Sequence, residues 1–80
     1  MAREIHNIYF GRLRDLRTIH HLTQAQVADY LGMKRNQYAR YEYGLRPIPV
    51  SALLALVELY HTSADYILSL TDDPRPKRRS

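Results

Sequence analysis

The sequence contains no cysteine among its 80 residues. Neither a disulfide framework nor a thiolate metal site is therefore possible, which fits a reducing compartment. The three glycines lie too far apart to form a phosphate-cradling loop. No apolar run approaches the roughly 20 residues that a transmembrane helix needs. The first ten residues also lack the apolar stretch of a secretory signal. We therefore expect a cytoplasmic chain with no membrane partner.

Groups suited to catalysis or metal binding do not form a recognisable set either. The four histidines fall at the starts and ends of predicted helices, without the i, i+4 spacing that would pair them on one face. Seven tyrosines are many for this length, but a tyrosine nucleophile would need a larger pocket and converging bases. We predict no enzyme activity, no catalytic or metal-binding residue, no cofactor and no small-molecule substrate.

Apolar residues recur at helical spacing along most of the chain, and no strand pattern is present. Eighty residues are enough for one domain with a modest core. The spacing predicts helices at about 7–20, 24–31, 35–43 and 50–60, and a last helix that Ser63 caps. We predict an all-α, compact five-helix domain over residues 1–70. Two prolines and four bases in residues 71–80 provide no means of packing, so a disordered basic tail is expected there.

The sequence also predicts which sides of the first and last helices face the core. Phe10, Leu13 and Leu16 are expected to point inward from the first helix, with Arg12 outward. In the last helix the expected apolar side is formed by Ile67, Leu68 and Leu70. The helix at 50–60 is apolar over much of its circumference, which indicates burial on a second side, for example by another subunit.

The stretch from Thr23 to Gly44 contains the clearest local signals. Thr23 and Gln26 form a Thr-x-x-Gln capping box at the start of one short helix, and Gly32 ends that helix. A second helical pattern follows after only a few residues. The small Ala28 stands where the two backbones should approach each other. These features together predict a helix-turn-helix.

The second helix of this pair has a polar outer face that suits DNA. Tyr38 and Tyr41 are predicted to point inward, and the outward residues are Arg35, Asn36, Gln37 and Arg40. Arginine pairs with guanine, and asparagine or glutamine with adenine, in a major groove wide enough for a helix. A solvated helix face is the alternative, and the residue types alone favour the two interpretations about equally. The turn that precedes the helix favours the DNA interpretation. Residues 1–46 also carry eight Lys/Arg against four Asp/Glu.

Four neighbouring residues are weaker candidates for contacts with DNA. Gln24 could bind a phosphate at the start of its helix, although helix starts are often polar anyway. Lys34 precedes the second helix and is expected at a phosphate or a base edge, or simply exposed. Tyr43 and Arg46 follow the helix and can reach the DNA backbone, or they form an ordinary surface loop.

From Ile8 to Leu70 the chain resembles the helix-turn-helix domain of the Cro/phage-repressor (XRE) family. The shared marks are LRDLR at the start, LTQAQVADYLG, the Tyr41-Glu42 pair, RPIP and SADYIL. The resemblance implies a lambda-repressor-like five-helix domain that binds near-palindromic operator DNA, usually as a homodimer, and regulates transcription. It also implies a prokaryotic or phage protein associated with DNA.

The resemblance also implies roles for individual residues. Gln24 matches the family's phosphate-binding glutamine, and Lys34 to Gln37, with Arg40, occupy the base-reading stretch. Arg17 and Glu42 match an Arg–Glu ion pair that ties the first helix to the third. Breaking a fully buried pair of this kind costs about 3–5 kcal/mol.

This chain departs from the family pattern at four positions. Lys34 replaces the usual capping Ser or Thr, His21 and His61 replace turn glycines, and Tyr38 is larger than the usual Ile or Val.

Two functions from different classes follow. The first is a sequence-specific, non-enzymatic DNA-binding regulator, expected to be a repressor, that reads the major groove with the helix at about 35–43. The second is a protein-interaction module, such as an antitoxin or an anti-repressor partner, that uses the apolar helices at 50–70. The Arg, Asn and Gln residues gathered at the start of one helix favour DNA, because a pure interaction module has no need of them.

Overall fold

The computed structural model describes residues 6–76, and the side chains of residues 11–76. It contains five helices in this range: α1 (His6–Ile19), α2 (Gln24–Tyr30), α3 (Arg35–Glu42), α4 (Val50–Tyr60) and α5 (Ala64–Ile67). The described part of the chain has no strand. The predicted all-α, five-helix class is therefore confirmed, and α4 has the predicted bounds.

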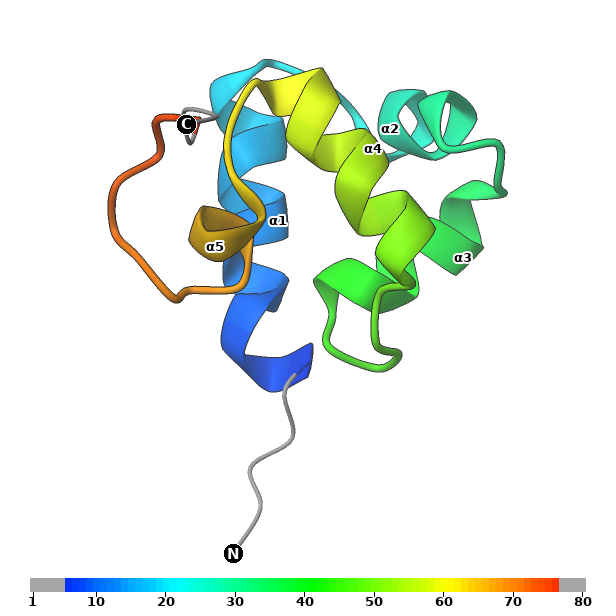
Figure 1. Cartoon of the computed structure of the whole chain (residues 1–80). Helices are drawn as coiled ribbons and strands as arrows, with labels where there is room; N and C mark the ends of the chain where they lie inside the picture. The colour runs from blue at the N-terminus through cyan, green and yellow to red at the C-terminus, as the bar shows by residue number, and fades with distance from the viewer. Residues whose placement is uncertain (1–5, 77–80) are drawn as a thin grey trace, which may run out of the picture.

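The helices form one compact body with α1 and α4 at its centre (Figure 1). In this view α2 and α3 lie on one side of the body. The short α5 and the C-terminal segment lie on the opposite side (Figure 1). Because α2 and α3 form an outer edge, their solvent-facing sides remain available to a partner.

Side-chain caps begin two of the helices, as the sequence predicted. The hydroxyl oxygen of Thr23 accepts a hydrogen bond from the backbone N–H of Gln26 at 3.1 Å, and the Gln26 side chain accepts one from the N–H of Thr23 at 2.8 Å. Ser63 caps α5 by accepting from the N–H of Tyr66 at 3.0 Å. Each cap satisfies a backbone donor that has no partner inside the helix.

All five described helices end in the same backbone arrangement. A residue with positive φ follows each helix: His21, Gly32, Gly44, His61 and Ser69. The next residue donates its N–H to a carbonyl five residues back: Leu22 to Arg17, Met33 to Ala28, Leu45 to Arg40, Thr62 to Val57 and Leu70 to Asp65, at 2.8–3.1 Å. This is the Schellman motif, which normally uses glycine at the positive φ. Three of the five turns are therefore built without it.

The core lies where the helices meet. Its fully buried large side chains are Leu13, Val27, Tyr38, Leu56 and Ile67. Leu16 is also buried, so the predicted inward positions of α1 are confirmed where side chains are described. The predicted inward position of Phe10 falls outside them. Leu70 is a correction, because α5 ends at Ile67 and the turn at Ser69 leaves Leu70 72% exposed.

Within the C-terminal segment, Thr71, Asp72 and Pro74 form hydrogen bonds with other parts of the domain. Arg12 donates from Nη1 to the carbonyl oxygens of Tyr66 at 3.0 Å and Thr71 at 3.1 Å, and from Nη2 to Asp72 Oδ1 at 2.7 Å. Its guanidinium also lies 4.1 Å from the centre of the Tyr66 ring. Arg12, predicted to point outward, thus holds this segment in place. Residues 77–80 of the predicted tail fall outside the described residues.

Candidate nucleic-acid interface

The turn between α2 and α3 is short and tightly bonded. Gly32 has a φ of 71°, and its N–H donates to the carbonyl of Asp29 at 3.1 Å. The N–H of Met33 donates to the carbonyl of Ala28 at 3.0 Å. Ala28 itself is buried, at the close approach that its small size predicted. The local sequence therefore sets α3 at a defined angle to α2, as in a helix-turn-helix.

The inner face of α3 fastens the helix to the body. Tyr38, Tyr41 and Glu42 are all buried, with Ala39 beside them. The rings of Tyr38 and Tyr41 meet edge to face, with their centres 6.4 Å apart. This arrangement is favourable for aromatic pairs. The predicted inward position of both tyrosines is confirmed, and α3 is left with a single outward face.

The outer face of α3 is polar and positively charged. Its exposed residues are Lys34 at the N-cap, then Arg35, Asn36, Gln37 and Arg40. An open depression of about 570 Å³ lies between this face and the loop that follows α3. The predicted residues that line it are Lys34, Asn36, Gln37, Arg40 and Arg46. The structure thus brings five of the predicted residues around one hollow.

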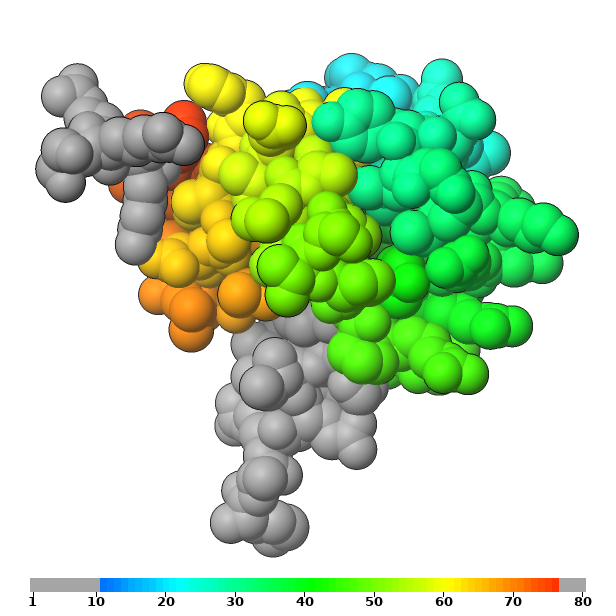
Figure 2. Space-filling model, turned by 45° about the vertical axis from the view of Figure 1, so that its right-hand side comes forward, coloured from blue at the N-terminus to red at the C-terminus, as the bar shows by residue number. Residues whose placement is uncertain are grey.

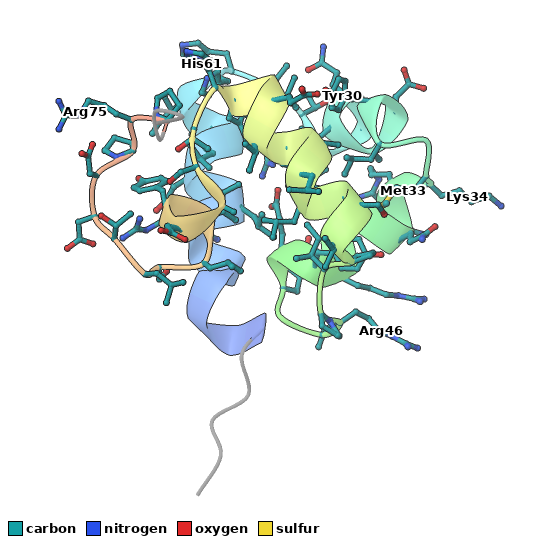
Figure 3. The ribbon with its side chains drawn as sticks, viewed as in Figure 1. Tyr30, Met33, Lys34, Arg46, His61 and Arg75 are labelled. Atoms are coloured by element: carbon teal, nitrogen blue, oxygen red, sulfur yellow. The ribbon has the colours of Figure 1, made fainter. Side chains whose placement is uncertain are left out.

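The other predicted residues, which are Gln24, Arg35 and Tyr43, do not line this depression. Figure 3 shows Lys34 and Arg46 extending from the same side of the domain. Tyr43 follows α3 directly and is 59% exposed, but it does not line the hollow. The surface over α3 and the following loop, green in Figure 2, is uneven, with several side chains projecting from it. Such projecting side chains can reach into a groove.

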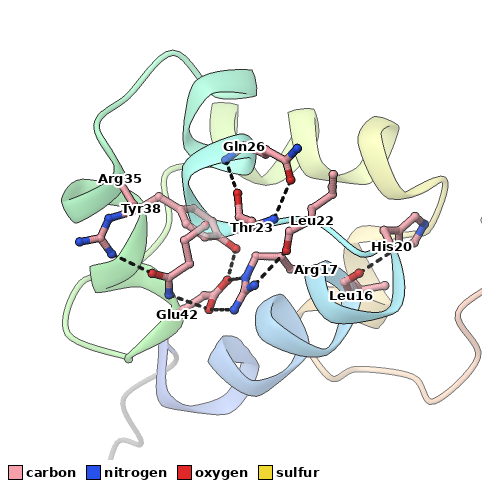
Figure 4. Close-up of polar contacts among 10 residues, drawn as sticks. Leu16, Arg17, His20, Leu22, Thr23, Gln26, Arg35, Tyr38 and Glu42 are labelled. Carbon is pink, nitrogen blue, oxygen red and sulfur yellow. Dashed lines mark hydrogen bonds and ion pairs between the residues drawn. The ribbon is translucent and has the colours of Figure 1, made fainter.

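Behind this face, a buried carboxylate joins three helices. Glu42 Oε2 accepts from Arg17 Nε and from the Tyr38 hydroxyl, both at 2.6 Å (Figure 4). Its Oε1 accepts from Arg17 Nη2 and from Gln24 Nε2, both at 3.1 Å. Arg17 also donates from Nη1 to the carbonyl of Leu22 at 3.0 Å. The Arg17–Glu42 pair that the resemblance implied is present, and it has two further donors.

The ionisation of this cluster follows from its contacts. Burial alone would raise the pKa of Glu42, but the hydrogen bonds from Arg17, Tyr38 and Gln24 outweigh it, and the net pKa lies below the ordinary value. Burial, and then the bond to Glu42, raises the pKa of Tyr38. The hydrogen bond to Glu42 raises the pKa of Arg17. The cluster is therefore an ionised pair with a neutral tyrosine, tied to the inner side of α3.

Gln24 connects this buried cluster to the outer face. Its Nε2 donates to Glu42, as described, and its Oε1 accepts from Arg35 Nη1 at 3.2 Å. Arg35 in turn donates from Nη2 to Asn36 Oδ1 at 3.1 Å. A continuous series of hydrogen bonds thus runs from Arg17 in α1 to the two residues that begin α3.

Lys34 begins α3 without a side-chain cap. Its backbone has the extended conformation of an N-cap residue, with φ −76° and ψ 150°, but its side chain accepts no hydrogen bond from the helix. An ammonium group has no acceptor to offer. This is the consequence expected where lysine replaces serine or threonine.

Two contacts at this site were missed in the sequence. The sequence predicts that Tyr38 points inward but gives no partner for its hydroxyl, which donates to Glu42. For Gln24 the sequence predicts only a contact to phosphate, whereas its side chain binds Glu42 and Arg35. The i, i+4 spacing of Tyr38 and Glu42 on one helix was the available signal, because residues at that spacing are neighbours on a helix surface. No comparable signal links Gln24 to Arg35, which belong to different helices.

Comparison with known proteins agrees with this geometry. Residues 13–67 match the helix-turn-helix family. The chain belongs to this family. It is also similar to the "Uncharacterized HTH-type transcriptional regulator YobD" of Bacillus subtilis (strain 168), with 46% identity over 70 residues. The match covers 88% of this chain and 62% of the relative, so the chain spans less than two thirds of that protein. No solved structure gives a significant match.

Membership of the family confirms several predictions. The resemblance to Cro/phage-repressor domains and the lambda-repressor-like fold class are both correct. The family consists of DNA-binding transcription regulators and is non-enzymatic, as predicted.

Over the described residues, no helix is long and apolar enough to cross a membrane. Within the same range, no group of three or more His, Asp or Glu residues could hold a metal ion.

Proposed function

We propose that this chain is a sequence-specific DNA-binding regulator of transcription that places α3 in the major groove. The observation that carries the proposal is the outer face of α3, where Lys34, Arg35, Asn36, Gln37 and Arg40 are all exposed around or beside one depression. Arg can form two hydrogen bonds with guanine, and Asn or Gln can form two with adenine. The buried inner face fixes the direction in which these side chains project.

Contacts to the DNA backbone come from the margins of this face. Arg46 lines the depression from the loop after α3, and the exposed Tyr43 lies next to the end of the helix. A guanidinium and a hydroxyl group can both donate to phosphate oxygens. Gln24 stands at the start of α2, where the resemblance implies a further phosphate contact. These contacts set the register of α3 on the duplex and carry no sequence information themselves.

We further propose that the regulator acts as a repressor and binds a near-palindromic operator as a homodimer. Apolar side chains on the outer side of α4 support an assembly, since Val50 is 69% exposed and Leu54 is 55% exposed. A symmetric dimer presents two copies of α3, one to each half-site. The same exposed side chains are the observation that favours the second candidate, a module that binds another protein.

Selection of bound fragments from random duplex DNA tests the proposed function. We expect one enriched motif with two inverted half-sites about one helical turn apart. Recovery of DNA without an enriched motif would contradict sequence-specific binding. Light scattering with and without the selected duplex then separates the two uses of α4. A dimer on DNA supports the homodimer, whereas a monomer that binds another protein through Val50 and Leu54 supports the interaction module.

A further inference from the structure

We propose that a hollow between the ends of α1 and α4 and the C-terminal segment binds a small neutral aromatic molecule that carries one O–H or N–H group. The site is separate from the face proposed to bind DNA, because none of the predicted DNA contacts lines this hollow. It lies on the side of the domain where Arg75 projects, opposite Lys34 and Arg46 (Figure 3).

The size and the walls of the hollow suit a small ring system. Its volume is about 360 Å³. Ligand sites in proteins usually measure about 300–1,000 Å³, so this one lies at the small end of the range. Its walls come from α1, the end of α4, α5 and the C-terminal segment. The apolar and aromatic part of the lining consists of Leu16, Ile19, Tyr60, Tyr66, Pro74 and Pro76.

Hydrogen bonds hold the C-terminal wall of this hollow in place. Arg12 donates to the carbonyl of Thr71 at 3.1 Å and to Asp72 Oδ1 at 2.7 Å. Thr62 donates from Oγ1 to the carbonyl of Pro74 at 2.6 Å. The hollow is therefore formed before a ligand arrives, and a preformed site loses less conformational freedom on binding.

His20 offers a hydrogen-bond acceptor to a molecule in the hollow, which it also lines. Its Nδ1 lies 2.9 Å from the carbonyl oxygen of Leu16 (Figure 4). Because a carbonyl can only accept, Nδ1 carries the hydrogen, and Nε2 of the neutral ring is an acceptor. Nε2 has no hydrogen-bond partner among the described residues. The ring packs against Tyr60, with the two ring centres 4.9 Å apart. An O–H or N–H group of a ligand can donate to Nε2.

The charges around the hollow favour a neutral ligand. Arg75 lines it, but Asp73 already binds this guanidinium, through Nε at 2.9 Å and through Nη2 at 2.8 Å. A charged ligand would have to displace Asp73 or give up its hydration without a counter-ion, which is costly. An aromatic molecule can instead pack against Tyr60 and Pro74 and lose no solvated charge.

Indole, whose N–H can donate, and 1-methylindole, which lacks that hydrogen, are the two probes. Each is titrated into the ¹⁵N-labelled chain and followed by nuclear magnetic resonance. We expect the backbone amide signals of Ile19, Thr62 and Tyr66 to shift, and those of Arg35 and Gln37 to stay in place. Indole should bind roughly 2- to 12-fold more tightly than 1-methylindole, because one net hydrogen bond contributes about that much. Indole should also raise the thermal midpoint of the domain.

Two variants test the role of His20. His20→Phe keeps an aromatic ring against Tyr60 and removes the acceptor, so it should bind the two probes with equal affinity. His21→Asn is the matched control, because His21 does not line the hollow and asparagine tolerates its φ of 57°. The control should keep the preference for indole. Circular dichroism of both variants checks that they are folded.

Three results would overturn the proposal. The first is a spectrum that does not change up to the solubility limit of indole, or that changes over the whole surface. The second is equal affinity of the wild-type chain for the two probes, a comparison that needs no variant to fold. The third is a preference for indole that persists in folded His20→Phe. None of these results bears on operator binding, so the failure of this site leaves the proposed function intact.

Discussion

Removing the hydroxyl group of Tyr38 is expected to destabilise the domain, whereas removing that of Tyr60 is not. The Tyr38 hydroxyl donates to the ionised carboxylate of Glu42 at 2.6 Å. Hydrogen bonds to charged groups contribute about 1.5–3 kcal/mol. In Tyr38→Phe the carboxylate keeps both bonds from Arg17 and the bond from Gln24, so it is not left unpaired. We therefore expect a loss of about 1.5 kcal/mol, at the low end of that range.

Tyr60 provides a matched control. It is also buried in the core, but its hydroxyl has no hydrogen-bond partner among the described residues. Burial is the main cause that raises its pKa to about 12. Because an unpaired buried hydroxyl is itself costly, Tyr60→Phe should leave the free energy of unfolding unchanged or raise it by up to about 1 kcal/mol.

Urea denaturation followed by far-ultraviolet circular dichroism measures both variants. The expected result is a lower midpoint for Tyr38→Phe, with the slope m equal to that of the wild-type chain. A thermal melt of Tyr38→Phe should have its midpoint lowered by about 6–12 °C. Equal destabilisation by the two substitutions would refute the reasoning, because it would mean that the bond to Glu42 contributes nothing specific.

Three further predictions concern stability. Lys34→Ser should raise the free energy of unfolding, measured by urea titration, by about 1 kcal/mol, because serine supplies the missing cap of α3. Because the substitution also removes a cation, it should weaken DNA binding, which fluorescence anisotropy measures. His61→Gly should raise the thermal midpoint, with a gain of about 0.5–1 kcal/mol, because His61 has a φ of 51°; an unchanged or lowered midpoint would contradict this. The pKa of Glu42 is lower in the folded than in the unfolded state. Its ionisation therefore stabilises the fold, and this stabilisation is fully present above the unfolded pKa of about 4.3. The stabilisation is lost as the pH falls through the lowered pKa of the folded state. A free energy of unfolding of the wild-type chain that rises on acidification would argue against this prediction.

The local parts of this fold were predictable from the sequence because each depends on neighbouring residues. Three such features each form from residues only a few positions apart. They are the capping box at Thr23, the glycine turn at Gly32 and the cap at Ser63. Helical spacing placed Tyr38 inward and the residues around it outward. These signals were sufficient for the five helices and for the outer face of α3.

Contacts between distant segments were not predictable in the same way. The helical pattern predicts that Arg12 points outward, but its side chain binds Tyr66, Thr71 and Asp72, which are 54 to 60 positions away. Periodicity describes one helix and does not report what packs against it. The contacts of Thr71, Asp72 and Pro74 were not predictable for the same reason, since the proline-rich and charged composition of residues 71–80 predicts a disordered basic tail and names no partner.

The central claim is that the outer face of α3 recognises DNA. The most direct test of this claim is the base preference of the Arg35→Ala variant. The measurement is the dissociation constant for the selected operator and for each of its single-base variants. Arg75→Ala is the control, because Arg75 is exposed and lies on the opposite side of the domain from Lys34 and Arg46 (Figure 3). The account predicts that Arg35→Ala loses about 1–3 kcal/mol of discrimination at one base pair, and that Arg75→Ala leaves the preference at every base pair unchanged. Equal loss of affinity for all sequences in Arg35→Ala would contradict it.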